Sequence, residues 1–288
     1  MAEPSVSMTL TVGQLATLAC QLEVAAPKPG NVHRGADFED VTLQDFLASG
    51  IAIGPVMDLA ASRSLGVTVR DAVLVTRQVA GSNTNLGMIL LLAPLAMVKD
   101  ATKLREGVRA ILDHTTPEDS AQVYEALRLA NPGGMGNQAE MDIQAVPPED
   151  LLAAMRHAES YDLIARQYTH GMEDLFEQVL PSLIDSHWEN LPWPRRIVRA
   201  HLVTMSQFPD SLIARKCGPE IAEKSALLAA QVLEAGDPNS EAYQWHLAQL
   251  DFWLRSDGHR RNPGTTADMI TAALFAGLRM GLIRPPFG

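Results

Sequence analysis

Apolar side chains recur at helical spacing along most of the chain. One stripe lies within residues 11–26 and consists of Leu15, Leu18, Ala19, Leu22 and Ala26. The valine-rich segment 69–80 could form a strand, but its apolar positions also fit one helix face, which we favour: Val69, Ala72, Val73, Thr76 and Val79. The strict alternation typical of half-buried strands is almost absent. The pattern therefore predicts an all-α globular fold of about ten or more helices.

Residues 131–150 (NPGGMGNQAEMDIQAVPPED) break this pattern, because they are rich in glycine and proline and carry no helical stripe. They form either a linker between lobes or a functional loop. No other segment looks like a domain boundary, and no repeat indicates a solenoid. We therefore expect a single domain over residues 1–288, with an irregular excursion near 131–150.

The longest apolar run, residues 88–98, is too short to span a bilayer and contains Pro94, so it predicts a core helix. The N-terminal residues show no cationic region followed by an apolar stretch, and we expect no signal peptide and no membrane partner. The apolar C-terminal helices, including residues 245–254, would form either a homodimer interface or part of the core.

The charge of the chain narrows the choice of ligand. Lys and Arg total 23 against 34 Asp and Glu, a net charge of −11, which argues against a nucleic-acid binder. A small polyanion remains compatible, because a few local cations and Mg²⁺ can hold one. The only cysteines are Cys20 and Cys217, so we expect no disulfide framework and a cytoplasmic location.

The first of four polar segments interrupting the helices is residues 26–40 (APKPGNVHRGADFED). Its two prolines must end the preceding helix. Gly30 permits a positive φ or a close backbone approach. The stiff turn would then display Lys28, His33 and Arg34.

The second segment is residues 80–92 (AGSNTNLGMILLL). Ser82, Asn83 or Thr84 can cap the apolar helix that follows, and such a helix start also attracts anions. Gly87 costs about 1 kcal/mol relative to alanine inside a helix. That cost predicts that another group approaches the helix closely at this point.

The third and fourth segments are residues 206–224 and 260–275. Asp210 begins a short helix in the third, and Asp268 follows a cap-like threonine pair in the fourth. Taken alone, each segment can also be explained without a ligand, by helix capping and solvated charges. Together, the four segments predict a polar cleft formed by helix N-termini and loops.

The order of four motifs, PKPGNVHRG, GSNTNLG, DSLIARKCG and NPGTTADMI, resembles that of the triphosphoribosyl-dephospho-CoA synthase family. Its members are also called ATP:dephospho-CoA triphosphoribosyl transferases. The resemblance runs from about residue 12 to 282 and is closer to the archaeal-type branch than to the branch found with citrate and malonate lyases.

The resemblance implies a largely helical enzyme that moves the triphosphoribosyl group of ATP to the 2′-hydroxyl of 3′-dephospho-CoA, or of a related acceptor, and releases adenine. The product would be the precursor of a prosthetic group. ATP would bind with Mg²⁺.

This chemistry builds positive charge on the ribose, as in glycoside hydrolysis, and needs an acid or base, phosphate-binding cations and a hydrogen-bonding cradle. We predict Asp210 and Asp268 as catalytic acids, with His33 as a further candidate. Asp37 and Asp58 are candidate Mg²⁺ ligands. The predicted binding residues are Lys28, Gly30, Asn31, Arg34, Ser82, Asn83, Thr84, Asn85, Gly87, Arg215, Lys216, Asn262, Gly264 and Thr265.

Two alternatives stay open at the level of sequence. One is a helical protein that binds a nucleotide or CoA-like ligand without turnover. The other is a Mg²⁺-dependent nucleoside triphosphate hydrolase. The P-loop motif is absent, and isolated cysteines without paired histidines argue against a zinc site.

Overall fold

The computed structural model describes residues 9–131 and 146–287 and confirms the all-α fold. The predicted excursion near 131–150 falls mostly outside these residues. Within them lie fourteen α-helices and one short extended segment, β1 (Ser256–His259). The α-helices are α1 (Val12–Ala25), α2 (Leu43–Leu59), α3 (Leu65–Val79), α4 (Leu86–Met97), α5 (Leu104–Asp113), α6 (Pro117–Ala130), α7 (Leu151–Ala158), α8 (Leu163–Thr169), α9 (Leu180–Ile184), α10 (Trp193–Gln207), α11 (Ser211–Cys217), α12 (Pro219–Glu234), α13 (Glu241–Arg255) and α14 (Gly264–Arg279).

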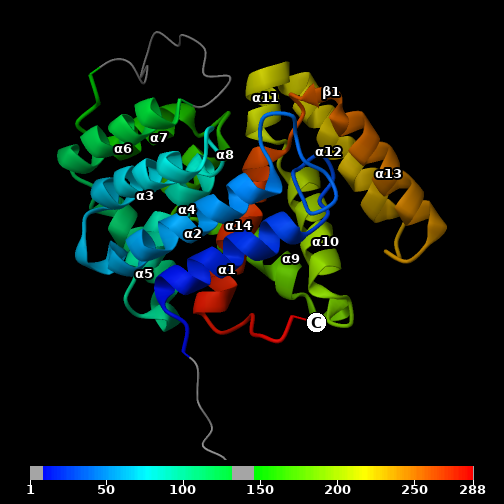
Figure 1. Ribbon diagram of the computed structural model, residues 1–288, viewed down its shortest axis with the longest axis horizontal. Helices are drawn as coiled ribbons and strands as arrows, with labels where there is room; N and C mark the ends of the chain where they lie inside the picture. Colours follow the sequence, from blue (N-terminus) through cyan, green and yellow to red (C-terminus); the bar gives the residue numbers. More distant parts are fainter. Residues whose placement is uncertain (1–8, 132–145, 288) are drawn as a thin grey trace, which may run out of the picture.

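Two helices, α4 and α14, form the centre of the core. Every residue of α4 from Met88 to Ala96 is buried, which confirms the predicted core helix. Such a helix is apolar all round because neighbours cover every side of it. Helix α14 packs against α1, α4 and α10. In Figure 1, α3, α5, α6 and α7 lie on one side of this centre, and α10 to α13 lie on the other.

Charged residues of α14 contact both ends of α4. Near the start of α14, the Asp268 carboxyl group lies against the first turn of α4, where a Cβ atom at Gly87 would lie 1.9 Å from Asp268 Oδ2. At the end of α14, Arg279 donates to the backbone carbonyls of Leu95 and Val98, the latter at 2.7 Å. The two helices therefore run parallel. The acid lies at the positive end of the α4 dipole and the cation at its negative end.

The valine-rich segment is helical, as predicted, and forms α3. Val69, Ala72, Val73 and Thr76 are buried, whereas Val79 at its end is 47% exposed. The predicted stripe of α1 is only partly right, because its leucines are partly buried and the smaller Ala16, Ala19 and Cys20 form the innermost face.

The close packing of α1 on α2 explains this difference. A Cβ atom at Gly13 would lie 2.0 Å from the carbonyl oxygen of Gly54, and one at Gly50 would lie 2.9 Å from Cys20 Cβ. Only small residues permit helix backbones to approach so closely. Among the described helices, the segment Leu43–Ser62 alone has the length and hydropathy of a membrane span, a test that core helices also pass.

The loop after α1 folds back onto that helix through a buried ion pair. Lys28 Nζ lies 2.9 Å from Glu23 Oε1 and also donates to the Glu23 backbone carbonyl at 2.6 Å. The Lys28 side chain is fully buried and that of Glu23 almost fully. The predicted phosphate-binding role of Lys28 is therefore corrected, because its ammonium group neutralises Glu23 in the interior.

We expect Lys28→Met to destabilise the fold by about 3–5 kcal/mol, because it leaves the Glu23 carboxylate buried without a cation. The double variant Lys28→Met/Glu23→Gln should recover part of this loss. Urea unfolding measures both. The matched control is the exposed Lys103→Met, expected to change stability by less than about 0.5 kcal/mol. A similarly small change for Lys28→Met would show that the ion pair does not hold the loop.

Candidate functional site

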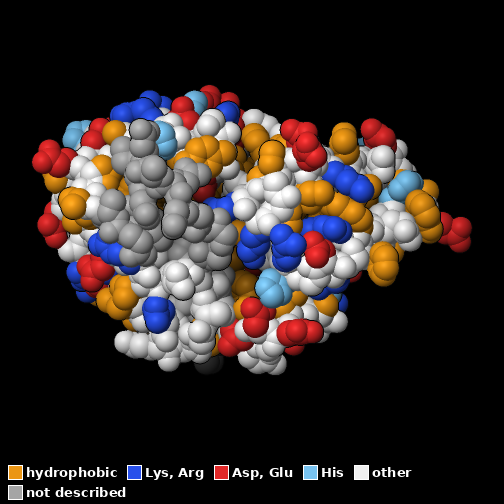
Figure 2. Space-filling view, turned by 90° about the horizontal axis from the view of Figure 1, so that it is seen from above, with side chains coloured by type: hydrophobic (Ala, Val, Ile, Leu, Met, Phe, Trp, Pro, Cys, Tyr) orange, Lys and Arg blue, Asp and Glu red, His pale blue; other side chains and the backbone are white. Residues whose placement is uncertain are grey.

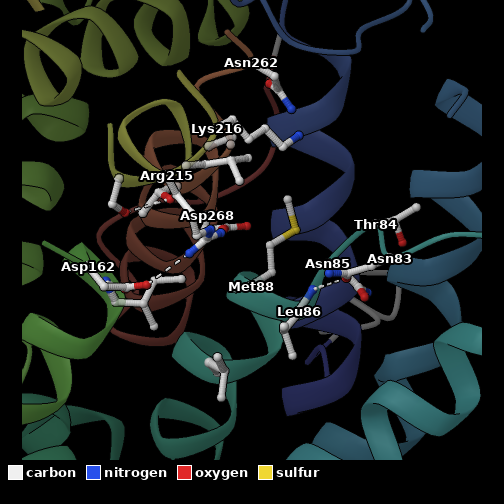
Figure 3. A pocket seen from close by; sticks show the side chains of 18 of the residues that line it. Asn83, Thr84, Asn85, Leu86, Met88, Asp162, Arg215, Lys216, Asn262 and Asp268 are labelled. Atoms are coloured by element: carbon white, nitrogen blue, oxygen red, sulfur yellow. Dashed lines mark hydrogen bonds and ion pairs between the residues drawn. The ribbon is translucent and has the colours of Figure 1, made fainter. Parts of the chain in front are cut away.

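A pocket of about 1040 Å³ opens between the loop after α1, the turn before α4, helices α7 and α8, and the starts of α11 and α14. Its volume is at the upper end of the range for small-molecule sites, about 300–1,000 Å³. The structure brings these predicted residues together on its lining: Asn31, Ser82, Asn83, Thr84, Asn85, Gly87, Arg215, Lys216, Asn262, Gly264, Thr265 and Asp268. Figure 3 shows part of this lining.

Most predicted residues of the first polar segment do not line the pocket. Gly30 has φ +73°, and its N–H donates to Asp251 at 2.7 Å, so this glycine shapes the loop. Arg34 is exposed. His33 accepts a hydrogen bond from Gly35 N–H within its own turn. Burial and the nearby Arg255 charge lower the pKa of His33. The structure does not support His33 as a catalytic acid or Arg34 as a phosphate ligand.

The predicted metal ligands Asp37 and Asp58 also lie outside the pocket lining. Asp37 accepts from the Leu43 backbone N–H at the start of α2, at 2.7 Å. Asp58 accepts from the Gly13 N–H near the start of α1, also at 2.7 Å. Over residues 9–131 and 146–287, no three His, Cys, Asp or Glu residues gather as a metal site. Asp37 and Asp58 thus bind helix starts away from the pocket, and their role as Mg²⁺ ligands stays a prediction.

Asp210 does not line the pocket; its buried carboxylate instead links the starts of two helices, α11 and α14, through hydrogen bonds. Its Oδ1 accepts from the N–H groups of Leu212 (2.9 Å) and Ile213 (3.0 Å) at the start of α11. Its Oδ2 accepts from the N–H and the hydroxyl of Thr266 in α14, both at 2.8 Å. Four donors and full burial leave this carboxylate no room for substrate. Its predicted catalytic role becomes a positioning role.

The prediction that a threonine side chain caps the start of α14 is wrong. Neither Thr265 nor Thr266 caps this helix with its own side chain. The cap oxygen comes instead from Asp210, 56 residues earlier. In the turn before α4, the prediction holds for one residue, because Asn83 Oδ1 accepts from the Leu86 N–H at 3.1 Å.

Asp268 lies on the pocket wall beside the first turn of α4. A Cβ atom at Gly87 would lie 1.9 Å from Asp268 Oδ2, so the glycine predicted to permit close approach does so for this carboxyl group. Burial and the negative charges of Glu23, Asp210 and Asp162 raise the pKa of Asp268 well above its ordinary value, against a hydrogen bond from Met88 N–H. No cation pairs with Asp268 among the described residues. The pocket therefore holds an acid of unusual basicity.

Two cations of α11 lie on the same pocket. Arg215 Nη1 lies 3.3 Å from Asp162 Oδ2, and Arg215 Nε has no partner. The Lys216 ammonium group has no ion pair among the described residues, and burial together with the Arg215 charge lowers the Lys216 pKa. Although the net charge is −11, Lys and Arg side chains gather near the centre of the face seen in Figure 2.

Several pocket residues were missed from sequence. Asp162 accepts from Ile164 N–H and Ala165 N–H at the start of α8 and orients Arg215. An Asp preceding an apolar stripe is a cap signal that could have identified it. Glu23 also lines the pocket but lies in the last turn of α1, where no sequence signal marks it as functional. His259, at the end of β1, and Asp40, in the loop after α1, also line the pocket, with His259 Nε2 3.6 Å from Asp40 Oδ2.

Fold and pocket together place two cations, Arg215 and Lys216, and a carboxyl group of raised pKa on one cavity of a helical protein, an arrangement that suits an anionic substrate. The chain matches the family model of ATP:dephospho-CoA triphosphoribosyl transferases over residues 9–284 and therefore belongs to that family. This confirms the resemblance seen in the sequence motifs and places the chain among transferases. Membership of this family does not favour the hydrolase, nor does it favour the binding protein without turnover.

A solved structure from Archaeoglobus fulgidus, assigned as a triphosphoribosyl-dephospho-CoA synthase, has a similar fold. The sequences are 27% identical, and the TM-score is 0.62. The match covers 82% of this chain and 99% of the archaeal chain. No curated protein matches the sequence at a significant level.

We expect Gly87→Ala to lower transferase activity by about 10²-fold, because the new methyl group must displace the Asp268 carboxyl group by an ångström or more. Steady-state rates with saturating substrates measure the effect. Gly81→Ala in the same turn is the matched control, since its Cβ would meet nothing within 4 Å. Equal activity of the two variants would show that the position of Asp268 is unimportant.

The raised pKa of Asp268 also predicts a pH-dependent stability. The folded state holds this proton more tightly than the unfolded state, so the resulting stabilisation is complete below the ordinary carboxyl pKa, about 3.9, and is lost as pH rises through the folded value. Asp268→Asn should therefore gain stability relative to wild type as pH increases from 4 to about 8. Urea unfolding across this range tests the sign, and a constant difference would contradict it.

Proposed function

We propose that this chain transfers the triphosphoribosyl group of ATP to the 2′-hydroxyl of 3′-dephospho-CoA and releases adenine, with Asp268 as the base. The single observation that carries the assignment is the pocket carboxyl group of Asp268, which has a raised pKa, lacks a cationic partner and shares the cavity with Arg215 and Lys216. The family supports the reaction, and the geometry supports the roles of the residues.

The reaction exchanges one bond at the anomeric carbon. The bond from C1′ of the ATP ribose to N9 of adenine breaks, and its electron pair passes to the purine. The acceptor oxygen bonds to C1′, and its hydroxyl proton is finally carried by adenine. Positive charge builds on the ribose as these bonds change. A base near the acceptor and fixed charges near the phosphates are therefore the main requirements.

Asp268 suits the role of base because its carboxylate form is disfavoured by burial and by neighbouring acids. A carboxylate of raised pKa takes a hydroxyl proton more readily than an ordinary one, and catalysis is best when the pKa approaches the working pH. Asp210 supports this role indirectly by holding Thr266, two residues before Asp268.

Arg215 and Lys216 would bind the triphosphate. Lys216 offers a compact charge with free N–H donors, and Arg215 has an unpartnered Nε directed by the Asp162 contact of its Nη1. Arginine binds phosphate oxygens with a planar fork of donors, which fixes orientation as well as charge. These two cations replace Lys28 and Arg34 in the phosphate-binding role.

Mg²⁺ would enter as part of the substrate, bound to ATP. Proteins commonly hold Mg²⁺ through one or two carboxylates together with substrate phosphates and water. A pocket carboxyl group such as Asp268 could contribute to holding such an ion together with the nucleotide phosphates. The cytoplasmic location and the homodimer remain predictions.

Incubation with MgATP and dephospho-CoA should release free adenine only when both are present. Asp268→Asn should lose about 10²- to 10⁴-fold in rate while remaining folded, and Lys216→Ala should raise KM for ATP about tenfold or more. Lys103→Ala, exposed and outside the pocket, serves as the control. ADP or AMP as the product would indicate the hydrolase instead. Nucleotide binding without any turnover would indicate the non-catalytic alternative.

A further inference from the structure

One polar side chain of the pocket has no partner although it is almost fully buried. Asn85 is 3% exposed, and neither its Oδ1 nor its Nδ2 makes a hydrogen bond within the part of the chain that the structure describes. It occupies the N-cap position of α4 without capping that helix. Buried amides in proteins are nearly always satisfied, so an unpaired one on a pocket wall points to a ligand that completes it.

The neighbours of Asn85 in the same turn are already engaged. Asn83 Oδ1 accepts from Leu86 N–H at 3.1 Å, and the hydroxyl groups of Thr84 and Ser49 lie 2.7 Å apart. These residues build the turn, whereas the Asn85 amide remains available on the pocket wall. In Figure 3, Asn85 lies on the opposite side of the view from Arg215.

The chemistry of an amide restricts the ligand group that it can bind. A phosphate offers only acceptors, so it would satisfy Nδ2 and leave Oδ1 unpaired against negative oxygens. The matching group must present a donor and an acceptor side by side. The N6 amino group and N7 of adenine do so, and asparagine pairs with this edge through two hydrogen bonds.

The surroundings of Asn85 also suit a flat heteroaromatic ring. Leu86 and Met88 follow it on the pocket wall. A second cavity of about 350 Å³ shares Asn85 with the main pocket, and its lining combines apolar Val73 and Leu129 with polar Thr76 and the cation Arg77. On the main pocket, the residues Ser82 to Met88 around Asn85 carry no charge, whereas the cations Arg215 and Lys216 come from α11. The nucleotide would therefore lie with its base at Asn85 and its phosphates at α11.

We propose that Asn85 binds the adenine of ATP, with Nδ2–H donating to N7 and Oδ1 accepting from the N6 amino group. This assignment rests on the proposed function and replaces the predicted phosphate or ribose contact of Asn85. Guanine carries an acceptor, O6, in place of the N6 amino group of adenine. If the Asn85 amide turned so that Nδ2 donated to O6, its Oδ1 would face N7, and two acceptors would repel each other. Asn85 thereby selects adenine over guanine.

The same contact assists departure of the base. When the bond between N9 and C1′ breaks, its electron pair enters the purine and N7 becomes a stronger acceptor. The hydrogen bond from Nδ2–H then strengthens in the transition state, and such a bond increases rate as well as affinity. Asn85 is therefore a catalytic residue on the leaving-group side, opposite in function to Asp268.

The test compares ATP, GTP and 7-deaza-ATP, in which a C–H replaces N7, in the wild type and in Asn85→Leu. Because 7-deazaadenine is an intrinsically poorer leaving group, the diagnostic quantity is the change in the ratio of kcat/KM for ATP to that for 7-deaza-ATP. Asn85→Leu should lower kcat/KM for ATP about 10²-fold and shrink this ratio about tenfold. The preference for ATP over GTP should shrink as well. Unchanged ratios would overturn the assignment.

Two further measurements separate this role from a structural one. Asn85→Leu should leave the free energy of unfolding of the ligand-free protein equal or higher, because an apolar side chain replaces an unpaired amide. A large loss of stability would show that Asn85 supports the fold instead. The matched control is Asn83→Ala, which removes an amide from the same turn and should preserve the ratio of ATP to 7-deaza-ATP even where its rate falls.

Binding measurements test the adenine contact of Asn85 independently of whether the proposed transfer reaction occurs. If the wild type releases no adenine, the reaction proposed above fails, but titration calorimetry still compares the Kd of ATP and 7-deaza-ATP. A wild-type preference for ATP that Asn85→Leu removes would support the adenine contact alone. Equal affinities in the wild type would overturn it.

Discussion

The buried carboxylate of Asp210 determines the shape of the pocket. Its two oxygens together accept four hydrogen bonds, two from the start of α11 and two from Thr266 in α14. The helix that carries Arg215 and Lys216 is thereby fixed against the helix that carries Asp268. Asp210 thus brings the cations proposed to bind phosphate and the carboxyl group proposed to move a proton to one cavity, although Asp210 itself does not line that cavity.

Asp268 is subject to opposing influences that come from the same packing. The positive end of the α4 dipole and the Met88 N–H favour its charged form, whereas burial and three nearby acids favour its protonated form. The second set prevails, and the resulting cost to the fold is characteristic of functional sites. The parallel contact of α4 with α14, completed by Arg279 at the other end, is what keeps this acid in its place.

The sequence predicts the helices and the four polar segments well, because prolines, glycines and cap residues mark helix ends by local chemistry. It does not predict which side chain of a segment faces the pocket. Lys28 follows α1 and Lys216 lies near the end of α11, and both are marked in sequence only as cations near a helix end. Yet Lys28 is neutralised by Glu23 inside the core, whereas Lys216 has no ion pair among the described residues. Asp210 and Asp268 also look alike in sequence. Asp210 is saturated with hydrogen bonds away from the pocket and Asp268 lies on the pocket wall, and this difference depends on contacts between residues far apart along the chain.

Gly87 and Asp268 are separated by 181 positions, yet the missing side chain of one makes room for the carboxyl group of the other, since a Cβ atom at Gly87 would lie 1.9 Å from Asp268 Oδ2. The two positions therefore cannot vary independently during evolution. A lineage that acquires a larger residue at the first position must lose or shift the acid at the second. The pair offers a criterion for sorting homologous sequences: chains that keep both residues retain this arrangement, and chains that change one are expected to have diverged in chemistry.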